Sequence, residues 1–324
     1  MSNTTAAHAA SSSEMAAGPS VRQRRQTTPV RRWAHRLQPV VWIGPAVGLI
    51  CFVVLWPVVV MVRTAFQRVS SFGEIKGSNG WRNFTNLFDE LAFKGVVERT
   101  IVWVVAVVGI TMLVSLALAQ LFDQRFPGRR VTRWALIAPW AASVLMTAIV
   151  FKWMLHPGYG LINILLHDVG LLNDLNSTSA DPLGKSGTAM PWLIFVAIFV
   201  SLPFTTYTIL AGLSTIPGEV YEAARVDGSS KWHTYRAITL PLLRPALTVA
   251  TLINVMNVFN SFPIIWAMTH GQPGYSTTTT TVFMYILKGK DLGESAAMSV
   301  VNFGLVVVIV ALFLKISRWK SEVD

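Results

Sequence analysis

Charged residues are scarce in this sequence. Asp, Glu, Lys and Arg together make up 13% of the 324 residues, about half of the ~25% that is usual in globular proteins. So few charges could not cover the surface of a soluble globule, because charged side chains are mostly exposed. An apolar content of 52% also excludes disorder over the whole chain. Together these values predict an integral membrane protein.

Cysteine is almost absent as well. The single cysteine, Cys51, lies in an apolar run, which excludes a disulfide framework and a cysteine metal site. The six histidines are scattered, and none is paired with a carboxylate at the helical spacing of metal ligands. Gly184-Lys185-Ser186 imitates the end of a phosphate-binding loop, but Ser179 stands where that motif needs its earlier glycine. We therefore expect no catalysis, metal or cofactor in this chain.

What the sequence does contain is a series of long apolar segments. A bilayer-spanning helix takes about 20 residues, and six segments meet that length. They are about 40–62, 100–121, 134–155, 189–213, 245–268 and 296–316. The apolar stretch 158–172 is shorter and carries His167 and Asp168, so it is interpreted as an interfacial or re-entrant piece. The first 36 residues lack a periodic apolar pattern and predict a disordered basic tail, followed by one membrane domain over 37–324.

The distribution of positive charge predicts the orientation. The net charge is +11, and six arginines precede the first apolar run, where orientation charges belong. If the N-terminus is inside, the inner segments hold 17 Lys and Arg and the outer loops 64–96, 156–188 and 269–295 hold 7. This bias is the positive-inside pattern. It predicts six spans, with both termini in the cytoplasm.

The cytoplasmic segment 214–247 contains the signals of a short helix. Pro217 fits a first helical turn, with Ser214 or Thr215 available as its cap. Glu219 stands near the positive end of the helix dipole. A helix is predicted over 219–226.

A turn and a second helix should follow. Gly228 permits the positive φ of a tight turn, and Ser229 or Ser230 can cap a helix that runs to Leu240, before Pro241. From the residues alone, this segment could be an ordinary helical hairpin on the membrane surface or an element that contacts a partner.

The fifth apolar segment carries a stripe of amides. Asn254, Asn257 and Asn260 share a stripe about 120° wide on a helix that turns 100° per residue. Intramembrane polar residues usually face a bundle interior or an aqueous cavity. The stripe could hold neighbouring helices together, or it could bind the hydroxyl groups of a neutral polyol. Aromatic side chains that could contact sugar rings are Phe259, Trp266, Trp153 and Phe204.

The strings EAARVDGSS and ITLPLLRP resemble the EAA loop of bacterial ABC importer permeases. The matching residues are Glu222-Ala223-Ala224, Asp227-Gly228-Ser229 and Leu240 to Pro245, and Ser229 stands where the family usually has alanine. The segments WRNFTNLF, GLINILL, LPF and FNSF, and the region of Pro139, are similar to the carbohydrate-uptake branch, and within it to the MalF-like subunit. The resemblance covers about 40–318. The loop THGQPGYSTTT departs from the pattern, because Gln272 replaces the first of two glycines.

This resemblance implies the type I ABC importer permease fold in a bacterial plasma membrane. The partners implied are a second permease, an ATPase dimer that binds the ATP and Mg, and an external sugar-binding protein. The resemblance assigns ATPase coupling to Glu222, Ala223, Ala224, Asp227 and Gly228. Ser201, Phe204 and Asn254 fall where a maltose-type permease contacts its sugar, and the substrate pathway is expected to include Asn257, Asn260 and Trp153 as well.

A neutral substrate is favoured over an anionic one. A phosphate or carboxylate would call for cations that face the pathway, whereas Arg63, Arg99 and Lys152 lie near predicted span ends, where long side chains can snorkel. A neutral di- or oligosaccharide is therefore expected. The alternatives are glycerol phosphate or another polyol, and a self-sufficient secondary transporter. The last would need membrane-embedded carboxylates or inverted repeats, and neither is evident in the sequence.

Overall fold

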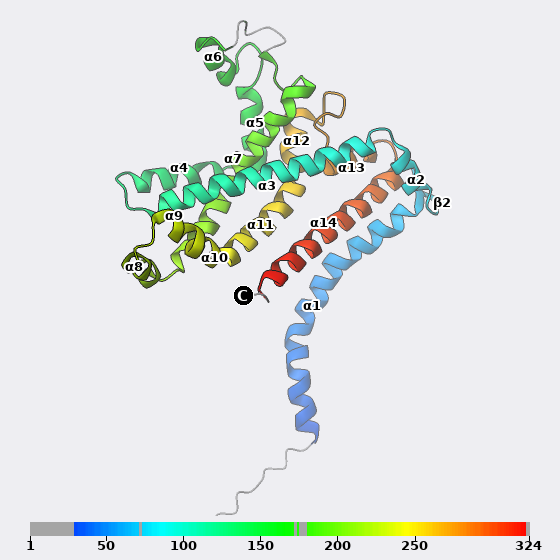
Figure 1. The fold of residues 1–324 in the computed structure, drawn as a ribbon. Coiled ribbons are helices and arrows are strands. Elements are labelled where there is room, and N and C mark those ends of the chain that lie inside the picture. The colour runs from blue at the N-terminus through cyan, green and yellow to red at the C-terminus, as the bar shows by residue number, and fades with distance from the viewer. Residues whose placement is uncertain (1–28, 71–72, 172–173, 175–179, 322–324) are drawn as a thin grey trace, which may run out of the picture. The chain divides into compact units, whose positions relative to one another are not determined.

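The computed structural model describes residues 29–70, 73–171, 174 and 180–321. Most of them are helical, and a short pair of strands follows the first helix (Figure 1). In chain order the elements are α1 (Pro29–Ala65), β1 (Gln67–Val69), β2 (Ile75–Ser78), α2 (Arg82–Asp89), α3 (Phe93–Asp123), α4 (Arg129–Ala141), α5 (Val144–Met154), α6 (Leu161–Asp168), α7 (Ser186–Ser214), α8 (Gly218–Val226), α9 (Lys231–Thr234), the π-helix η2 (Tyr235–Thr239), α10 (Leu240–Leu242), α11 (Arg244–Phe259), α12 (Phe262–Thr269), α13 (Thr280–Lys288) and α14 (Leu292–Ser321).

The chain divides into two compact units, Met1–Pro57 and Val58–Asp324. In the first unit, α1 begins at Pro29, a residue that suits the first helical position. Residues 29–36 of the predicted disordered tail belong to α1 in the structure, and the rest of that tail, 1–28, lies outside the described residues. The apolar side chains of this unit from Trp42 onward are exposed in the isolated chain, which fits a helix that lipid or another protein surrounds.

Within the described ranges, five helical segments are long and apolar enough to cross a membrane. They are Trp42–Ala65, Phe93–Asp123, Ser186–Ser214, Arg244–Thr269 and Leu292–Phe313, and they overlap five of the six predicted spans. The predicted span 134–155 is instead broken, because α4 ends at Ala141, Ser143 has extended backbone and α5 begins at Val144. Pro139 removes a backbone donor from the last turn of α4, which weakens that helix just before it ends.

A small antiparallel sheet was not expected from the sequence. Strand β1 pairs with β2, with an irregular register between Gln67 and Val69. The amide of Asn83, at the start of α2, donates to the carbonyl oxygens of Ala65 and Gln67 at 2.8 and 2.9 Å. This buried side chain therefore fixes the end of α1 and the start of β1 to α2.

The main core of the second unit is built around Trp103 of α3, which is buried against α5, α7, α11 and α12. Its indole Nε1 donates to the carbonyl oxygen of Val258 at 3.0 Å and to Oγ of Ser261 at 3.2 Å. These two acceptors lie at the break between α11 and α12. The carbonyl groups at a helix end lack intrahelical donors, so Trp103 stabilises an interruption in the fifth predicted span.

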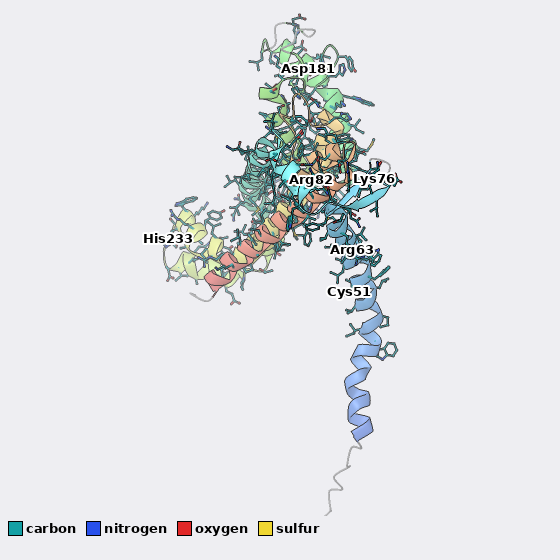
Figure 2. The ribbon with its side chains drawn as sticks, turned by 90° about the vertical axis from the view of Figure 1, so that its right-hand side faces the viewer. Cys51, Arg63, Lys76, Arg82, Asp181 and His233 are labelled. Carbon is teal, nitrogen blue, oxygen red and sulfur yellow. The ribbon has the colours of Figure 1, made fainter. Side chains whose placement is uncertain are left out.

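Two segments lie at opposite ends of the second unit. Figure 2 shows Asp181, in the loop after α6, far from His233 of α9. The predicted piece 158–172 contains α6, a helix of eight residues. The Asn163 amide is buried there and donates to three carbonyl oxygens, those of Leu155, His156 and Ala180, at 2.7–3.1 Å.

Candidate functional site

The predicted short helix of the 214–247 loop is present as α8. Its N-cap is Pro217, not Ser214 or Thr215 as predicted. These two hydroxyls instead donate to the carbonyl oxygens of Ala211 and Gly212, in the last turn of α7. Ser214 and Thr215 stand at the end of α7, where the last carbonyl groups of the helix lack intrahelical donors and accept these hydroxyl hydrogens.

The turn after α8 has the predicted conformation. Gly228 has a φ of +73°, a region that L side chains rarely adopt. The N–H of Ser229 donates to the carbonyl oxygen of Ala224 at 2.9 Å, which closes the end of α8. Ser230 caps α9 as one of the two predicted candidates, and its Oγ accepts from the N–H of His233 at 3.3 Å.

The second helix of this loop differs from the prediction. It does not end before Pro241, because α9 widens into η2 and continues through α10 toward α11. The N–H of Leu240 donates to the carbonyl oxygen of Tyr235, five residues back. Proline lacks an N–H group and its ring conflicts with the carbonyl four residues earlier. The wider π-turn just before Pro241 therefore coincides with the place where an α-helix would be strained.

The five predicted coupling residues have unequal burial. Ala224 is buried within the chain, whereas Glu222, Ala223, Asp227 and Gly228 are exposed. The hydroxyl of Thr239 in η2 donates to the Tyr221 hydroxyl at 3.4 Å, so α8 is tied to the second half of the loop. Ala224 therefore packs within this chain, whereas Ala223 and Glu222 are exposed.

Sequence reasoning missed two apolar side chains beside these residues. Val226, at the end of α8, is 88% exposed and Trp232 of α9 is 69% exposed. The Trp232 and Tyr235 rings lie 6.0 Å apart, and burial raises the pKa of the Tyr235 hydroxyl above its ordinary value. Large apolar residues inside an otherwise polar segment were the signal that could have found them.

A cavity of about 480 Å³ lies between α4, α5, α7, α11 and α12. We call it the helix-break cavity, because the interruption between α4 and α5 and the one between α11 and α12 both border it. Its size falls within the ~300–1,000 Å³ of small-molecule sites. Its lining residues are Trp140, Val144, Ala197, Val200, Ser201, Phe204, Thr205, Asn254, Asn257, Val258, Asn260, Ser261, Pro263 and Ile264.

All three residues of the asparagine stripe line this cavity. Asn254 is 2% exposed, and its Nδ2 has no hydrogen-bond partner within the described part of the chain. Asn257 is exposed, and Asn260 caps the end of α11 with its Nδ2 donating to the Met256 carbonyl oxygen at 3.0 Å. A buried amide donor without a partner is costly, so Asn254 is the residue of the stripe with most to gain from a ligand.

The other predicted pathway residues are divided between two places. Ser201 and Phe204 of α7 line the helix-break cavity, where Phe204 faces the same space as Asn254. Trp153 does not; it lies at the end of α5 in a separate hollow with Tyr159 and Leu161. The cavity instead contains Trp140, which is 60% exposed and which the sequence analysis missed. A tryptophan in the interior of a predicted span was the available signal.

None of the residues that line the helix-break cavity is charged. The cations that the sequence analysis considered lie elsewhere: Arg63 is exposed in the last turn of α1, and Arg99 donates to the Thr278 carbonyl oxygen at 3.4 Å. Lys152 donates from Nζ to the carbonyl oxygen of Ala267 at 3.1 Å, in the last turn of α12, where a positive charge is favourable.

The sequence matches a known family over most of its length. Residues 111–319 match the family described as "Binding-protein-dependent transport system inner membrane component". A probable ABC transporter permease protein of Brucella suis biovar 1 is 40% identical over 290 residues, which cover 89% of this chain and 99% of the relative. The sulfoquinovosyl glycerol transport system permease protein SmoG of Agrobacterium fabrum is 32% identical, with 90% and 94% covered. The trehalose/maltose transport system permease protein MalF of Thermococcus litoralis is 29% identical, with 86% and 93% covered.

The fold is also similar to a solved structure. A chain from the crystal structure of a bacterial ABC transporter involved in the import of the acidic polysaccharide alginate aligns with a TM-score of 0.74 at 21% identity, covering 90% of this chain and 99% of that one. This likeness bears on the fold alone. The apolar helices, the EAA-type loop and the family match lead to one conclusion: the chain belongs to the binding-protein-dependent transport inner-membrane family and is a carbohydrate-uptake ABC permease, a multi-pass protein of the bacterial plasma membrane.

Proposed function

We propose that this chain forms one half of the translocation pathway of an ATP-driven sugar importer and that the helix-break cavity binds the sugar. A second, related permease would complete the pathway. The observation that carries the proposal is the position of Asn254. Its buried Nδ2 has no hydrogen-bond partner among the described residues, and it borders a cavity lined by two further amides and by the aromatic side chains of Trp140 and Phe204. Amides offer both donors and acceptors to hydroxyl groups, and aromatic surface suits the apolar face of a sugar ring.

The energy for transport would come from a separate ATPase dimer. Helix α8 would lie in a groove on the surface of the ATPase, with Glu222 and Ala223 outward and Gly228 making the bend toward α9. This chain would transmit ATPase closure to the spans and would itself bind neither ATP nor Mg. An external sugar-binding protein would deliver the substrate at the opposite side.

The proposed topology has six crossings and two cytoplasmic termini. In this arrangement α4 and α5 together make the third crossing, and the break at Ser143 lies within the membrane. Irregular backbone at that depth is tolerated where it lines a cavity, which agrees with the position of Val144 at the helix-break cavity.

The proposed substrate is a neutral di- or oligosaccharide. The uncharged lining of the cavity supports this choice, because an anionic group would call for a fixed cation or similar compensation. Glycerol phosphate or another polyol is the alternative for the same complex. One relative is named for glycerol phosphate: the sn-glycerol-3-phosphate transport system permease protein UgpA of Pectobacterium atrosepticum, which is 29% identical.

Co-purification followed by a transport assay tests the proposal. The tagged protein should bring down a second permease and an ATPase, and the assembled complex with its sugar-binding protein should take up a labelled neutral saccharide into vesicles. Unlabelled neutral saccharides should compete, and glycerol phosphate should not. Recovery of the chain alone, with transport that needs no ATP, would contradict the importer assignment. Competition by glycerol phosphate alone would contradict only the substrate class.

A further inference from the structure

We propose that the corner between α3 and α4 binds the headgroup of an anionic phospholipid. We call it the arginine corner and define it by Arg125, Arg129, Arg130 and Arg133. It lies at the C-terminal end of α3, on the same side of the unit as the 214–247 loop that contains α8 (Figure 1). The proposal rests on the proposed topology only for the leaflet, which is the cytoplasmic one.

The first observation is a local excess of positive charge. Four arginines stand within nine residues, directly after the 31-residue apolar helix α3. Asp123, which is exposed, is the sole carboxylate residue in the sequence from 99 to 167. The corner therefore keeps a charge of about +3 where a membrane-spanning helix leaves the bilayer, and basic clusters at that depth attract anionic headgroups.

Two of the four arginines are used to build the corner. Nη2 of Arg133 donates to the Phe122 carbonyl oxygen at 2.6 Å, and Nη1 of Arg129 donates to the Gln124 carbonyl oxygen at 3.3 Å. Both acceptors belong to the end of α3, whose free carbonyl groups favour a cation. The Tyr207 hydroxyl of α7 donates to the Arg133 carbonyl oxygen at 3.1 Å, so this side of α4 faces the protein.

The other two arginines are turned to the outside. Arg125 and Arg130 are exposed, and among the described residues neither forms an ion pair with a carboxylate. Arg130 and Trp134 are four residues apart in α4, so they share a face of the helix. Val131 and Trp134 beside them are 71% and 72% exposed. One outward face of α4 thus combines the cation of Arg130 with large apolar side chains, and Arg125 lies in the connection just before this helix.

This combination fits a phospholipid better than a free anion. A soluble phosphate would neutralise the guanidinium groups but would leave Val131 and Trp134 in water. A phospholipid satisfies both, because its phosphate pairs with Arg125 and Arg130 and its glycerol and acyl region covers the apolar side chains. Tryptophan is also enriched at the level of the headgroups, and basic amphipathic surfaces bind anionic membranes.

Lipid titration of the purified complex tests the inference without any transport measurement. The detergent-solubilised complex is titrated with phosphatidylglycerol and, separately, with phosphatidylcholine, and native mass spectrometry measures the bound fraction. Phosphatidylglycerol should bind selectively, and the double variant Arg125→Gln/Arg130→Gln should weaken that binding roughly tenfold. Arg125→Lys/Arg130→Lys keeps the charge and should retain most of the affinity. The matched control Lys231→Gln/Arg236→Gln removes two exposed cations from the 214–247 loop and should leave the binding of phosphatidylglycerol unchanged.

Five results would overturn it. Four concern lipid binding: equal affinity for the two lipids, an unchanged affinity in the Arg125→Gln/Arg130→Gln variant, an equal loss in the Lys231→Gln/Arg236→Gln control, and displacement of the lipid by millimolar inorganic phosphate. Loss of a protein subunit from the variant complex would likewise assign the corner to a protein contact. Because the readout is lipid binding, the sugar-import proposal can fail while this inference stands, and the reverse also holds.

Discussion

Asn254 is the residue whose replacement best separates a substrate contact from a structural one. Asn254→Leu removes a buried Nδ2 donor that has no partner in the described part of the chain, so the fold should lose little stability. A bound sugar would lose a hydrogen bond to a buried group, which is worth about 1–3 kcal/mol, or roughly five- to a hundredfold in affinity. Uptake per assembled complex should therefore fall while the yield of the complex is preserved.

A second buried asparagine provides the control for that experiment. Asn302 of α14 is 7% exposed with both amide atoms unpartnered among the described residues, and it does not line the helix-break cavity. Asn302→Leu should leave uptake per complex unchanged. If Asn254→Leu instead reduces the yield and thermal stability with normal uptake per complex, the stripe holds helices together and the binding site must move toward Ser201 and Phe204.

Trp140 and Trp153 offer a matched pair of aromatic residues. Trp140 lines the helix-break cavity and Trp153 lies outside it. Trp140→Ala should weaken sugar binding about tenfold, because burial of a large side chain against a ligand contributes roughly 1.5–3 kcal/mol. Trp140→Phe should recover most of the affinity, and Trp153→Ala should have no effect on it. Equilibrium binding of labelled sugar to the purified complex measures this, and the opposite ranking would return Trp153 to the pathway.

The turn after α8 carries the prediction about coupling. At a φ of +73°, a residue with a side chain is strained by about 1–2 kcal/mol even though open space surrounds Gly228. Gly228→Val should therefore reposition α8 and loosen the ATPase. Transport and substrate-stimulated ATP hydrolysis should fall together, by severalfold, in reconstituted vesicles.

Gly170 supplies a control with the same backbone strain. It has a φ of +77°, is also surrounded by open space, and lies in the loop after α6, at the other end of the unit. Gly170→Val should leave the ratio of transport to ATP hydrolysis unchanged. Normal coupled activity in Gly228→Val would show that this turn is not the transmission element.

The stability of the segment around α6 should depend on the side-chain amide of Asn163. Asn163→Leu would remove the Asn163 donor from the buried carbonyl oxygens of Leu155 and Ala180, at about 1–3 kcal/mol for each buried group. The carbonyl oxygen of His156 would keep the N–H of Gly160. Amide hydrogen exchange in 156–171 should rise severalfold, since local opening becomes easier. Asn86→Leu, an exposed change on α2, should leave exchange there unaltered. Unchanged protection in Asn163→Leu would mean that packing alone holds this loop.

The short elements of the 214–247 loop show where sequence reasoning works. Helix α8 could be predicted because Pro217 and Gly228 mark its ends by their own backbone preferences. The π-helix η2 could not, because it depends on where Pro241 meets a helix that has already begun at Lys231. The breaks at Ser143 and Asn260 were also missed. Apolar composition identifies a span, but it does not show whether that span is one helix or two.

Membrane orientation can be tested over the whole molecule. Cys51 is the only native cysteine, so Cys51→Ala gives a background without thiols. Lys76 of β2 and His233 of α9 are both exposed and are labelled in Figure 2. In intact cells, a membrane-impermeant maleimide should label Lys76→Cys and should label His233→Cys only after permeabilisation. The reverse pattern would contradict the positive-inside prediction.

The assembly of the helix-break cavity explains what the sequence could and could not reveal about the site. The amide spacing placed Asn254, Asn257 and Asn260 on one face of a helix, and the structure has all three at one cavity. The resemblance added Ser201 and Phe204, which line it too. Trp140 joins them only through the bend between α4 and α5, a tertiary feature that no local pattern encodes.

The hydrogen bonds from Trp103 to the break between α11 and α12 predict where substitutions that change the substrate range should occur. One indole N–H holds the Val258 carbonyl oxygen and the Ser261 hydroxyl, and both of those residues line the helix-break cavity although Trp103 does not. Selection for growth on a new sugar should therefore recover substitutions at codon 103 as well as at the lining positions. Such substitutions would broaden the substrate range because the residues at the α11–α12 break would become more mobile. Second-site substitutions that restore a hydrogen-bond donor to the break should suppress this effect.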